Sequence, residues 1–191
     1  MIRAAQGKMR NARRGPCMPI AVPFIVSPMM LPYVVSTLLY VFDSRDRVLL
    51  LNRMKKPNKG LWSPCGGKLD MASGESPYDC ACREGREEMG MNLKVSDLRL
   101  VGLISETGYE SEAHWLMFLF EIKPRLDQVP PPISEGYFQF FKPEELKDLP
   151  MPRTDREFIW PQFWRSRGGF FSAHCQCMDQ GQYQWTVEET R

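Results

Sequence analysis

Three glutamates spaced for one face of a helix constrain this chain more than any other feature. Glu84, Glu87 and Glu88 stand at positions i, i+3 and i+4, which are neighbours on a helix surface. Like charges in that arrangement destabilise an isolated helix. A divalent cation held by carboxylate oxygens would offset the repulsion. The alternative is a solvated acidic face, partly neutralised by Arg83 and Arg86.

The ends of this helix are also marked in the sequence. Ser76 is a good N-cap before a proline, and Gly90 is a typical C-terminal stop, so a helix is predicted over residues 77–89. Its apolar stripe would face a core, which leaves the glutamates facing the turn at Gly66 and Gly67. A backbone carbonyl from this glycine turn beside three carboxylates is a plausible Mg²⁺ site.

The remaining periodicity predicts a mixture of strands and helices. Strands are expected at 33–42, 47–51, 61–65, 98–106, 113–122, 137–141, 169–177 and 182–187. The first two are expected to form a hairpin, as are the last two. Further helices are expected at 143–149 and 154–165, the latter capped by Thr154 and broken or kinked at Pro161. Trp62 and Trp160 are interpreted as core residues.

The acidic segment resembles the signature of the Nudix hydrolases, G-x5-E-x7-R-E-U-x-E-E-x-G-U, where U is a bulky aliphatic residue. The matching positions are Glu75, Arg83, Glu84, Glu87, Glu88, Gly90 and Met91. Two positions depart from it: the loop between Gly67 and Glu75 is two residues longer, and Gly85 replaces an aliphatic residue. The resemblance implies a class α/β fold, the Nudix-type α/β/α sandwich with a mixed sheet.

The same resemblance implies the site. Mg²⁺, with Mn²⁺ as the alternative, would be held by the Gly66 carbonyl and by Glu84, Glu87 and Glu88. Arg83 would orient these carboxylates and Glu75. One of the helical glutamates or Glu135 would accept the proton of the attacking water, and the sequence does not choose between them.

Residues outside the signature resemble MutT-like enzymes that hydrolyse oxidised purine nucleoside triphosphates. Asp155 falls where such enzymes place an aspartate against the purine edge, although it is equally interpreted as a first-turn helix acid. Ser63 stands where an asparagine reads the base, and Lys68 is a candidate phosphate contact. The expected reaction converts a purine nucleoside triphosphate, such as 8-oxo-dGTP, to monophosphate and pyrophosphate.

Three other functions share this fold. ADP-ribose or a dinucleotide polyphosphate is an alternative substrate. A non-catalytic nucleotide-sensing module is disfavoured because all the signature glutamates are present. Isopentenyl diphosphate isomerase would use a cysteine near Cys65, but its histidine-rich metal site is missing because His114 and His174 are misplaced.

Charge and cysteine content suggest the partners and the compartment. Residues 1–42 hold five basic residues and no acid, whereas the rest of the chain has a net charge of −3. A mildly acidic domain is not expected to bind a nucleic-acid polymer. The six cysteines are interpreted as reduced and structural, as in the cytoplasm, without a zinc site. A monomer or homodimer is expected.

The N-terminal segment is interpreted apart from the domain. Residues 1–30 are expected to be a disordered or artefactual extension, and residues 31–191 the Nudix-type domain. An organellar address, or a true start at Met29 or Met30, are the alternatives. Four prolines between residues 18 and 35 argue against a membrane span.

Overall fold

The chain folds around two β-sheets, as a computed structural model shows for residues 31–56, 58–109, 113–178 and 181–191. The larger sheet has the strand order β1-β5-β4-β7-β8, and the smaller has the order β3-β2-β6. The strands are β1 (Tyr33–Tyr40), β2 (Val48–Arg53), β3 (Trp62–Ser63), β4 (Leu98–Tyr109), β5 (Ala113–Ile122), β6 (Gly136–Phe141), β7 (Phe171–Met178) and β8 (Gln182–Thr190). The helices are α1 (Pro77–Met89), α2 (Trp160–Arg165), the 3₁₀ helices η1 (Val95–Asp97) and η2 (Pro143–Asp148), and the π-helical turn η3 (Asp155–Ile159).

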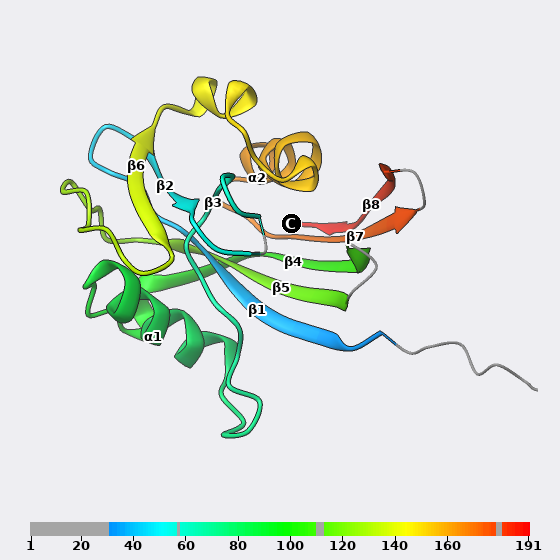
Figure 1. The fold of residues 1–191 in the computed structure, drawn as a ribbon, viewed down its shortest axis with the longest axis horizontal. Coiled ribbons are helices and arrows are strands. Elements are labelled where there is room, and N and C mark those ends of the chain that lie inside the picture. Colours follow the sequence, from blue (N-terminus) through cyan, green and yellow to red (C-terminus); the bar gives the residue numbers. More distant parts are fainter. Residues whose placement is uncertain (1–30, 57, 110–112, 179–180) are drawn as a thin grey trace, which may run out of the picture. The chain divides into compact units, whose positions relative to one another are not determined.

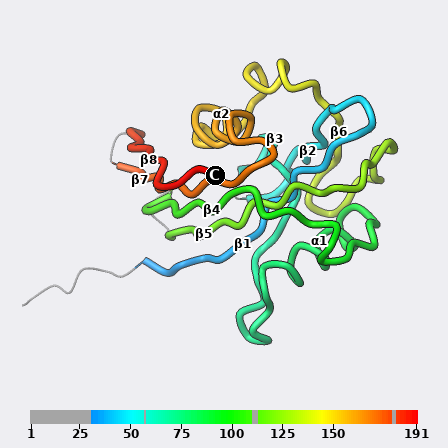
Figure 2. The backbone as a smooth tube through the Cα atoms, turned by 180° about the vertical axis from the view of Figure 1, so that it is seen from behind, coloured from blue at the N-terminus to red at the C-terminus, as the bar shows by residue number. Residues whose placement is uncertain are grey.

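The larger sheet is mixed and lies between two helical layers. β1 runs parallel to β5 and β4 runs parallel to β7, whereas the β4–β5 and β7–β8 pairs are antiparallel. α1 covers one face of this sheet and α2 covers the other (Figure 1). The view from behind shows the same order of layers (Figure 2). The expected α/β/α sandwich with a mixed sheet is therefore confirmed.

The alternation of side chains along β1 explains why both faces are buried. Leu39 and Val41 pack in the cluster on the α1 side, with Ala81 and Met89 of the helix. Tyr40 and Phe42 alternate with these residues along the chain, and they belong to the cluster on the α2 side. A strand has a side-chain period of two, so a continuous apolar run supplies two cores.

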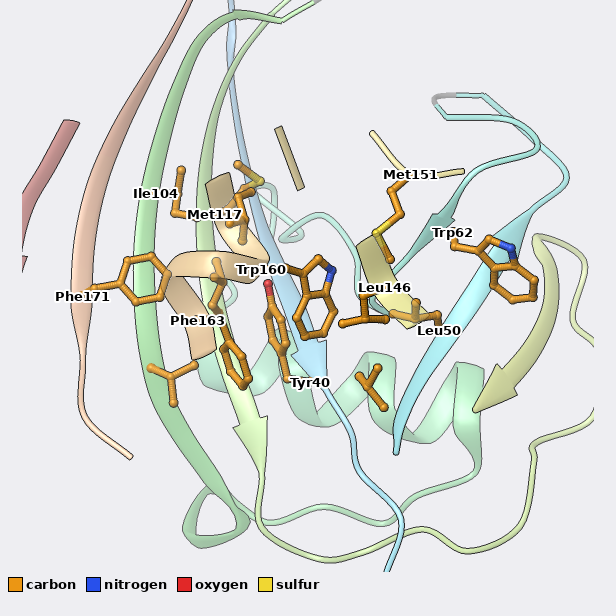
Figure 3. Packing of buried hydrophobic residues seen from close by; sticks show 14 of the residues in the cluster. Tyr40, Leu50, Trp62, Ile104, Met117, Leu146, Met151, Trp160, Phe163 and Phe171 are labelled. Atoms are coloured by element: carbon orange, nitrogen blue, oxygen red, sulfur yellow. The ribbon is translucent and has the colours of Figure 1, made fainter. Parts of the chain in front are cut away.

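Aromatic rings fill the core on the α2 side (Figure 3). The Tyr40 ring stacks on Phe163 with 4.5 Å between centroids, and Trp160 meets Tyr40 edge-on at 4.8 Å. Trp62 is 7% exposed and Trp160 is 3% exposed. Both tryptophans are core residues, as the sequence indicated.

α1 begins and ends at the residues that its sequence predicts. The Ser76 hydroxyl accepts a hydrogen bond from the Asp79 N–H at 3.1 Å and donates to the Asp79 carboxylate at 2.7 Å. Gly90 adopts a left-handed conformation with φ 69° and donates to the Arg86 carbonyl. A Cβ on Gly85 would lie 2.6 Å from Leu93, so Leu93 occupies the space of the aliphatic residue that the signature expects.

Two local expectations need correction. The hairpin of β1 and β2 is present only at its turn, where the Asp43 N–H donates to the Arg47 carbonyl at 3.0 Å and the Leu49 N–H to the Val41 carbonyl at 2.9 Å. Beyond the turn the strands separate into two sheets, because β1 pairs with β5 and β2 pairs with β3 and β6. Thr154 does not cap a helix: its backbone is already helical and its side chain makes no capping hydrogen bond. The turn that follows is π-helical, and Pro161 stands in the first turn of α2 after it.

Residues 31–191 form one compact unit. No helix in the described part of the chain is long and apolar enough to cross a membrane. The expectation for residues 1–30 lies outside the described residues.

Candidate active site

A cavity of about 420 Å³ opens where α1, the glycine turn and the strands of the larger sheet meet. Carboxylates stand in two groups around it, Glu84, Glu88 and Glu135 in the first and Glu106 and Asp155 in the second. Its other lining residues include Thr37, Arg53, Lys56, Ser63, Gly66, Gly67, Lys68, Tyr109, Trp115, Met117 and Thr154. The cavity therefore combines most of the residues that the sequence singled out.

Glu84 and Glu88 are the two helical glutamates that line the cavity. Glu84 is 9% exposed. The Glu88 carboxylate accepts hydrogen bonds from the Cys65 thiol at 2.8 Å and from the Gly66 N–H at 3.3 Å. Burial raises the pKa of Glu88 to about 7 and also raises the pKa of Glu84. Buried carboxylates of this kind are costly unless a cation joins them.

The glycine turn directs a backbone group at these carboxylates. The carbonyls of Cys65 and Gly67 accept hydrogen bonds from β1, at Leu39 and Thr37. Gly66 lies between them, lines the cavity, and directs its N–H at the Glu88 carboxylate. The two flanking residues therefore hold the turn against β1 while Gly66 itself meets the acidic group.

No side chain larger than hydrogen fits at this turn. A Cβ on Gly66 would lie 2.0 Å from the Thr37 carbonyl oxygen, and its φ of 147° favours glycine. A Cβ on Gly67 would lie 1.9 Å from Glu84 Oε1. The glycines thus allow the turn to approach β1 on one side and the Glu84 carboxylate on the other.

Arg83 connects the long loop to the helix. Its guanidinium donates to both oxygens of Glu75, from Nε at 2.8 Å and from Nη2 at 2.9 Å. Nη1 donates to Glu84 at 2.6 Å and to Glu87 at 3.3 Å. The hydrogen bond from Arg83 holds the pKa of Glu75 at about 2. A bidentate arginine of this kind fixes the position of both carboxylates.

Glu87 and Glu135 differ from the other two glutamates. The Glu87 side chain is 54% exposed and does not line the cavity, so the structure places it at the rim beside Arg83. Glu135 lines the cavity from the loop before β6, and its carboxylate lies 3.5 Å from Arg53 Nη2.

The donor set fits a hard divalent cation. Glu84, Glu88 and Glu135 offer carboxylate oxygens to the cavity, which Gly66 also lines, and Glu87 stands at its rim. Mg²⁺ and Mn²⁺ prefer such oxygen ligands. The raised pKa values of Glu84 and Glu88 describe the metal-free state, and a bound cation would lower them.

The second group of carboxylates includes a residue that sequence reasoning missed. Glu106 of β4 is 4% exposed, yet it lines the cavity with Asp155. Burial raises the pKa of Glu106 to about 7, although hydrogen bonds from Thr154 and Cys177 oppose the rise. Burial, and next the charge of Glu106, raise the pKa of Asp155 to about 8. A glutamate within an apolar strand was the sequence signal that could have revealed this pair.

Ser63 and Lys68, the two residues that the resemblance places near the substrate base and phosphates, both line the cavity. Ser63 is 7% exposed at the end of β3, whereas Lys68 is exposed with its Nζ 5.5 Å from the Trp115 ring centroid. Trp115 also lines the cavity and was missed. It stands with Met117 on one face of β5, a period-two pattern that the sequence contains.

Gly67→Ala should reduce activity without unfolding the domain. The new methyl group would displace the Glu84 carboxylate, which is the flexible end of a side chain. We expect a loss of about 10- to 100-fold in metal affinity or rate, as for other changes that move a ligand. Calorimetric titration with Mn²⁺ and a thermal melt measure the two properties. Gly66→Ala is the contrasting variant, because its new methyl group would clash with the Thr37 backbone and should lower the melting temperature. Unchanged metal affinity in Gly67→Ala would contradict the prediction.

The Glu106 and Asp155 carboxylates should make the stability of the fold depend on pH in the absence of divalent metal. Glu106 and Asp155 have raised pKa values, of about 7 and about 8, whereas both return to about 4 when the chain unfolds. Between those values the folded chain holds protons that the unfolded chain has lost. The free energy of unfolding should therefore fall as pH rises from about 4 to about 8. Urea denaturation across this range should show a shallower slope for Glu106→Gln/Asp155→Asn, and an identical slope would contradict the assignment.

Comparisons with known proteins agree with this geometry. Residues 32–160 match the model of the NUDIX domain family. The Uncharacterized Nudix hydrolase YvcI of Bacillus subtilis is 34% identical over 120 residues, which are 62% of this chain and 73% of that protein. The MutT protein from Bacillus halodurans has a similar fold, with a TM-score of 0.66 and 24% identity over 81% of this chain and 97% of that one. The NUDIX domain of Shewanella oneidensis NrtR, solved with ADP ribose, has a TM-score of 0.56 and 16% identity over 71% of this chain and 88% of that one.

The chain therefore belongs to the Nudix family. It is a Nudix hydrolase whose fold is similar to that of MutT proteins, and it is an enzyme that acts on the phosphoric anhydride bond of a nucleotide.

Proposed function

We propose that this enzyme hydrolyses a purine nucleoside triphosphate, of the oxidised type represented by 8-oxo-dGTP, to monophosphate and pyrophosphate. The observation that carries the proposal is the single cavity of about 420 Å³ lined by both carboxylate groups. Glu84 and Glu88 would bind the cation that meets the phosphates, and Asp155 with Glu106 would bind the base. A cavity of this volume suits a small ligand with few polar anchors.

The acidic group would perform the hydrolysis with Mg²⁺, or Mn²⁺ as the alternative. When bound, the cation neutralises phosphate charge and activates water for attack. Glu84, Glu88 and the Gly66 carbonyl would hold it, with Glu87 at the rim, and Arg83 would keep Glu84 and Glu75 in place. Glu135 would accept the proton of the attacking water. Its support is its position: it lines the cavity, and its charge contributes to the raised pKa of both Glu84 and Glu88.

The second group would select the substrate. A carboxyl pair with raised pKa values can accept hydrogen bonds from purine N–H groups, or donate one when protonated. Ser63 adds a hydroxyl, and Trp115 offers an aromatic face within the same cavity. Lys68 and Lys56 supply positive charge for the phosphates. ADP-ribose is the alternative substrate, favoured by the ADP ribose bound to the NrtR domain of the same fold.

A pyrophosphate-release assay across nucleotides tests the proposal. The full chain is assayed with and without Mg²⁺ on purine triphosphates with and without the 8-oxo group, on pyrimidine triphosphates and on ADP-ribose, with AMP formation measured for the last. We expect Mg²⁺-dependent release that is fastest from the oxidised purine triphosphates. Equal or faster cleavage of ADP-ribose would overturn the substrate assignment while leaving the hydrolase assignment intact.

The domain boundaries, the oligomeric state and the compartment are also part of the proposal. We propose that the catalytic domain is residues 31–191, which acts as a monomer or homodimer, and that a chain beginning at residue 31 keeps the activity. The five cysteines that the structure describes are free, which supports a reducing compartment such as the cytoplasm. The substrate is a small nucleotide, and neither a nucleic-acid polymer nor a membrane is a partner.

A further inference from the structure

A second set of potential metal ligands lies away from α1, on the neighbouring strands β4 and β7. The ligand atoms of Glu106, Cys175 and Cys177 all lie within 4.8 Å of one another. Glu106 is the register partner of Cys175 in the parallel β4–β7 pair. Cys177 is two residues further along β7, so its side chain is on the same face as that of Cys175. The backbone of a rigid sheet therefore brings the three groups together.

The spacing of these atoms suits one tetrahedral ion. The Cys177 sulfur lies 3.7 Å from Glu106 Oε1. A zinc ion with ordinary bond lengths to a thiolate and a carboxylate would separate those two atoms by about 3.6 Å. His174, which directly precedes Cys175, takes no part, because its Nδ1 is 2.7 Å from the Ser105 hydroxyl and its side chain is on the other face.

The surroundings make the group costly to ionise without a cation. Cys175 is 1% exposed and Glu106 is 4% exposed. Burial, followed by the charge of Glu106, raises the pKa of Cys175 to about 12 and that of Cys177 further still. The two thiols and the carboxyl group surround one point, and all three have raised pKa values. A metal ion bound at that point would lower these pKa values, because it displaces the protons.

We propose that Glu106, Cys175 and Cys177 bind a zinc ion, with water as the fourth ligand. Two thiolates favour zinc or another soft cation over Mg²⁺, which prefers oxygen ligands alone. The oxygen-only group of Glu84, Glu88 and Gly66 has the opposite preference. The two places in this enzyme would thus take different metals from the same solution.

Zinc at this place would inhibit the enzyme. Glu106 lines the cavity beside Asp155, so a metal that takes its carboxylate removes one of the two groups assigned to the base. This consequence rests on the proposed function, whereas zinc binding itself does not. The cluster would couple zinc availability to turnover of the purine substrate.

Cobalt titration tests the binding directly, because Co²⁺ replaces Zn²⁺ and a cobalt–thiolate bond absorbs in the near ultraviolet. The full chain, kept reduced with a phosphine and supplied with excess Mg²⁺, is titrated with CoCl₂. We expect a thiolate charge-transfer band that saturates at one equivalent and is abolished by one equivalent of Zn²⁺. Cobalt bound only by the α1 carboxylates would give no such band.

Variants locate the site. Cys177→Ser should abolish the charge-transfer band, and Glu106→Gln should weaken cobalt binding at least tenfold. Cys82→Ser is the matched control, since Cys82 is a half-buried cysteine on α1 outside the cluster, and it should leave the band unchanged. Circular dichroism verifies that each variant folds. A band that survives in folded Cys177→Ser, or no band in the reduced wild type, would overturn the proposal.

Activity provides a separate measurement. With 8-oxo-dGTP and Mg²⁺, substoichiometric to equimolar Zn²⁺ should inhibit the wild type and Cys82→Ser but not Cys177→Ser. If the charge-transfer band is present and no nucleotide is hydrolysed, the zinc site stands and the proposed function fails. If cobalt binds through thiolates and zinc leaves hydrolysis unaffected, the regulatory consequence is wrong.

Discussion

Glu88→Gln is expected to lower the turnover number about 10³-fold or more while the domain stays folded. Glu88 lines the cavity and accepts hydrogen bonds from the Cys65 thiol and the Gly66 N–H, so its carboxylate is held against the glycine turn. Glutamine keeps the volume and both acceptor contacts through its carbonyl, but it removes the negative charge that a divalent cation needs. Steady-state pyrophosphate release at saturating Mg²⁺, together with a thermal melt, measures the two effects.

Two variants calibrate this result. Glu144→Gln removes an exposed carboxylate from η2, outside the cavity, and should have wild-type activity. Glu87→Gln should show a smaller loss than Glu88→Gln, because the Glu87 side chain is 54% exposed at the rim. Near-wild-type turnover of Glu88→Gln would show that the cation is held elsewhere.

The acidic helix was predictable because each of its signals is local. Ser76, Gly90 and the three glutamates act within one or two turns of helix, where spacing along the chain determines spacing in space. The contact between Arg83 and Glu75 was also expected, because Glu75 directly precedes the N-cap of the helix and Arg83 lies in its second turn. The burial of each glutamate, however, could not be predicted, because it depends on tertiary contacts. The three glutamates are equivalent in the sequence, but in the structure Glu84 is buried, Glu88 is half-buried and Glu87 is exposed.

The part of the cavity assigned to the purine base was harder to predict from the sequence, because long-range contacts assemble it. In the sequence, Glu106 is only a polar residue at the end of an expected strand. The parallel β4–β7 pairing then places it opposite Cys175. The sequence predicts Thr154 as a helix cap, but its side chain donates a hydrogen bond to Glu106 instead. Arg153, the residue before Thr154, pairs with Glu157 and lies over Tyr183, and it does not line the cavity.

Strand pairing was predictable only at the turn. The tight turn between β1 and β2 forms as local rules predict, with hydrogen bonds from the Asp43 N–H to the Arg47 carbonyl and from the Leu49 N–H to the Val41 carbonyl. Beyond this turn the apolar run of β1 is buried on both faces and pairs along its length with β5, as the edge strand of the larger sheet. Tertiary burial therefore decides the pairing beyond the turn.

Asp155→Ala is expected to reduce kcat/KM for purine triphosphates about 10- to 100-fold more than for pyrimidine triphosphates. Asp155 lines the cavity beside Glu106, and removing its carboxyl leaves hydrogen-bond donors on the purine edge unmatched, at a cost of about 1–3 kcal/mol. The metal-binding residues are untouched, so Mg²⁺ dependence should not change.

The structure separates this expectation from the interpretation of Asp155 as a first-turn helix acid. An acid stabilised by a helix N-terminus has a lowered pKa, whereas burial raises the pKa of Asp155 to about 8. Glu157→Ala is the matched control, because Glu157 is an exposed acid of the same π-helical turn that pairs with Arg153 outside the cavity. The prediction would be contradicted if Asp155→Ala loses equal activity toward purine and pyrimidine substrates and Glu157→Ala shows the same loss. Asp155 would then have only a structural role, and the base contacts would be left to Glu106, Ser63 and Trp115.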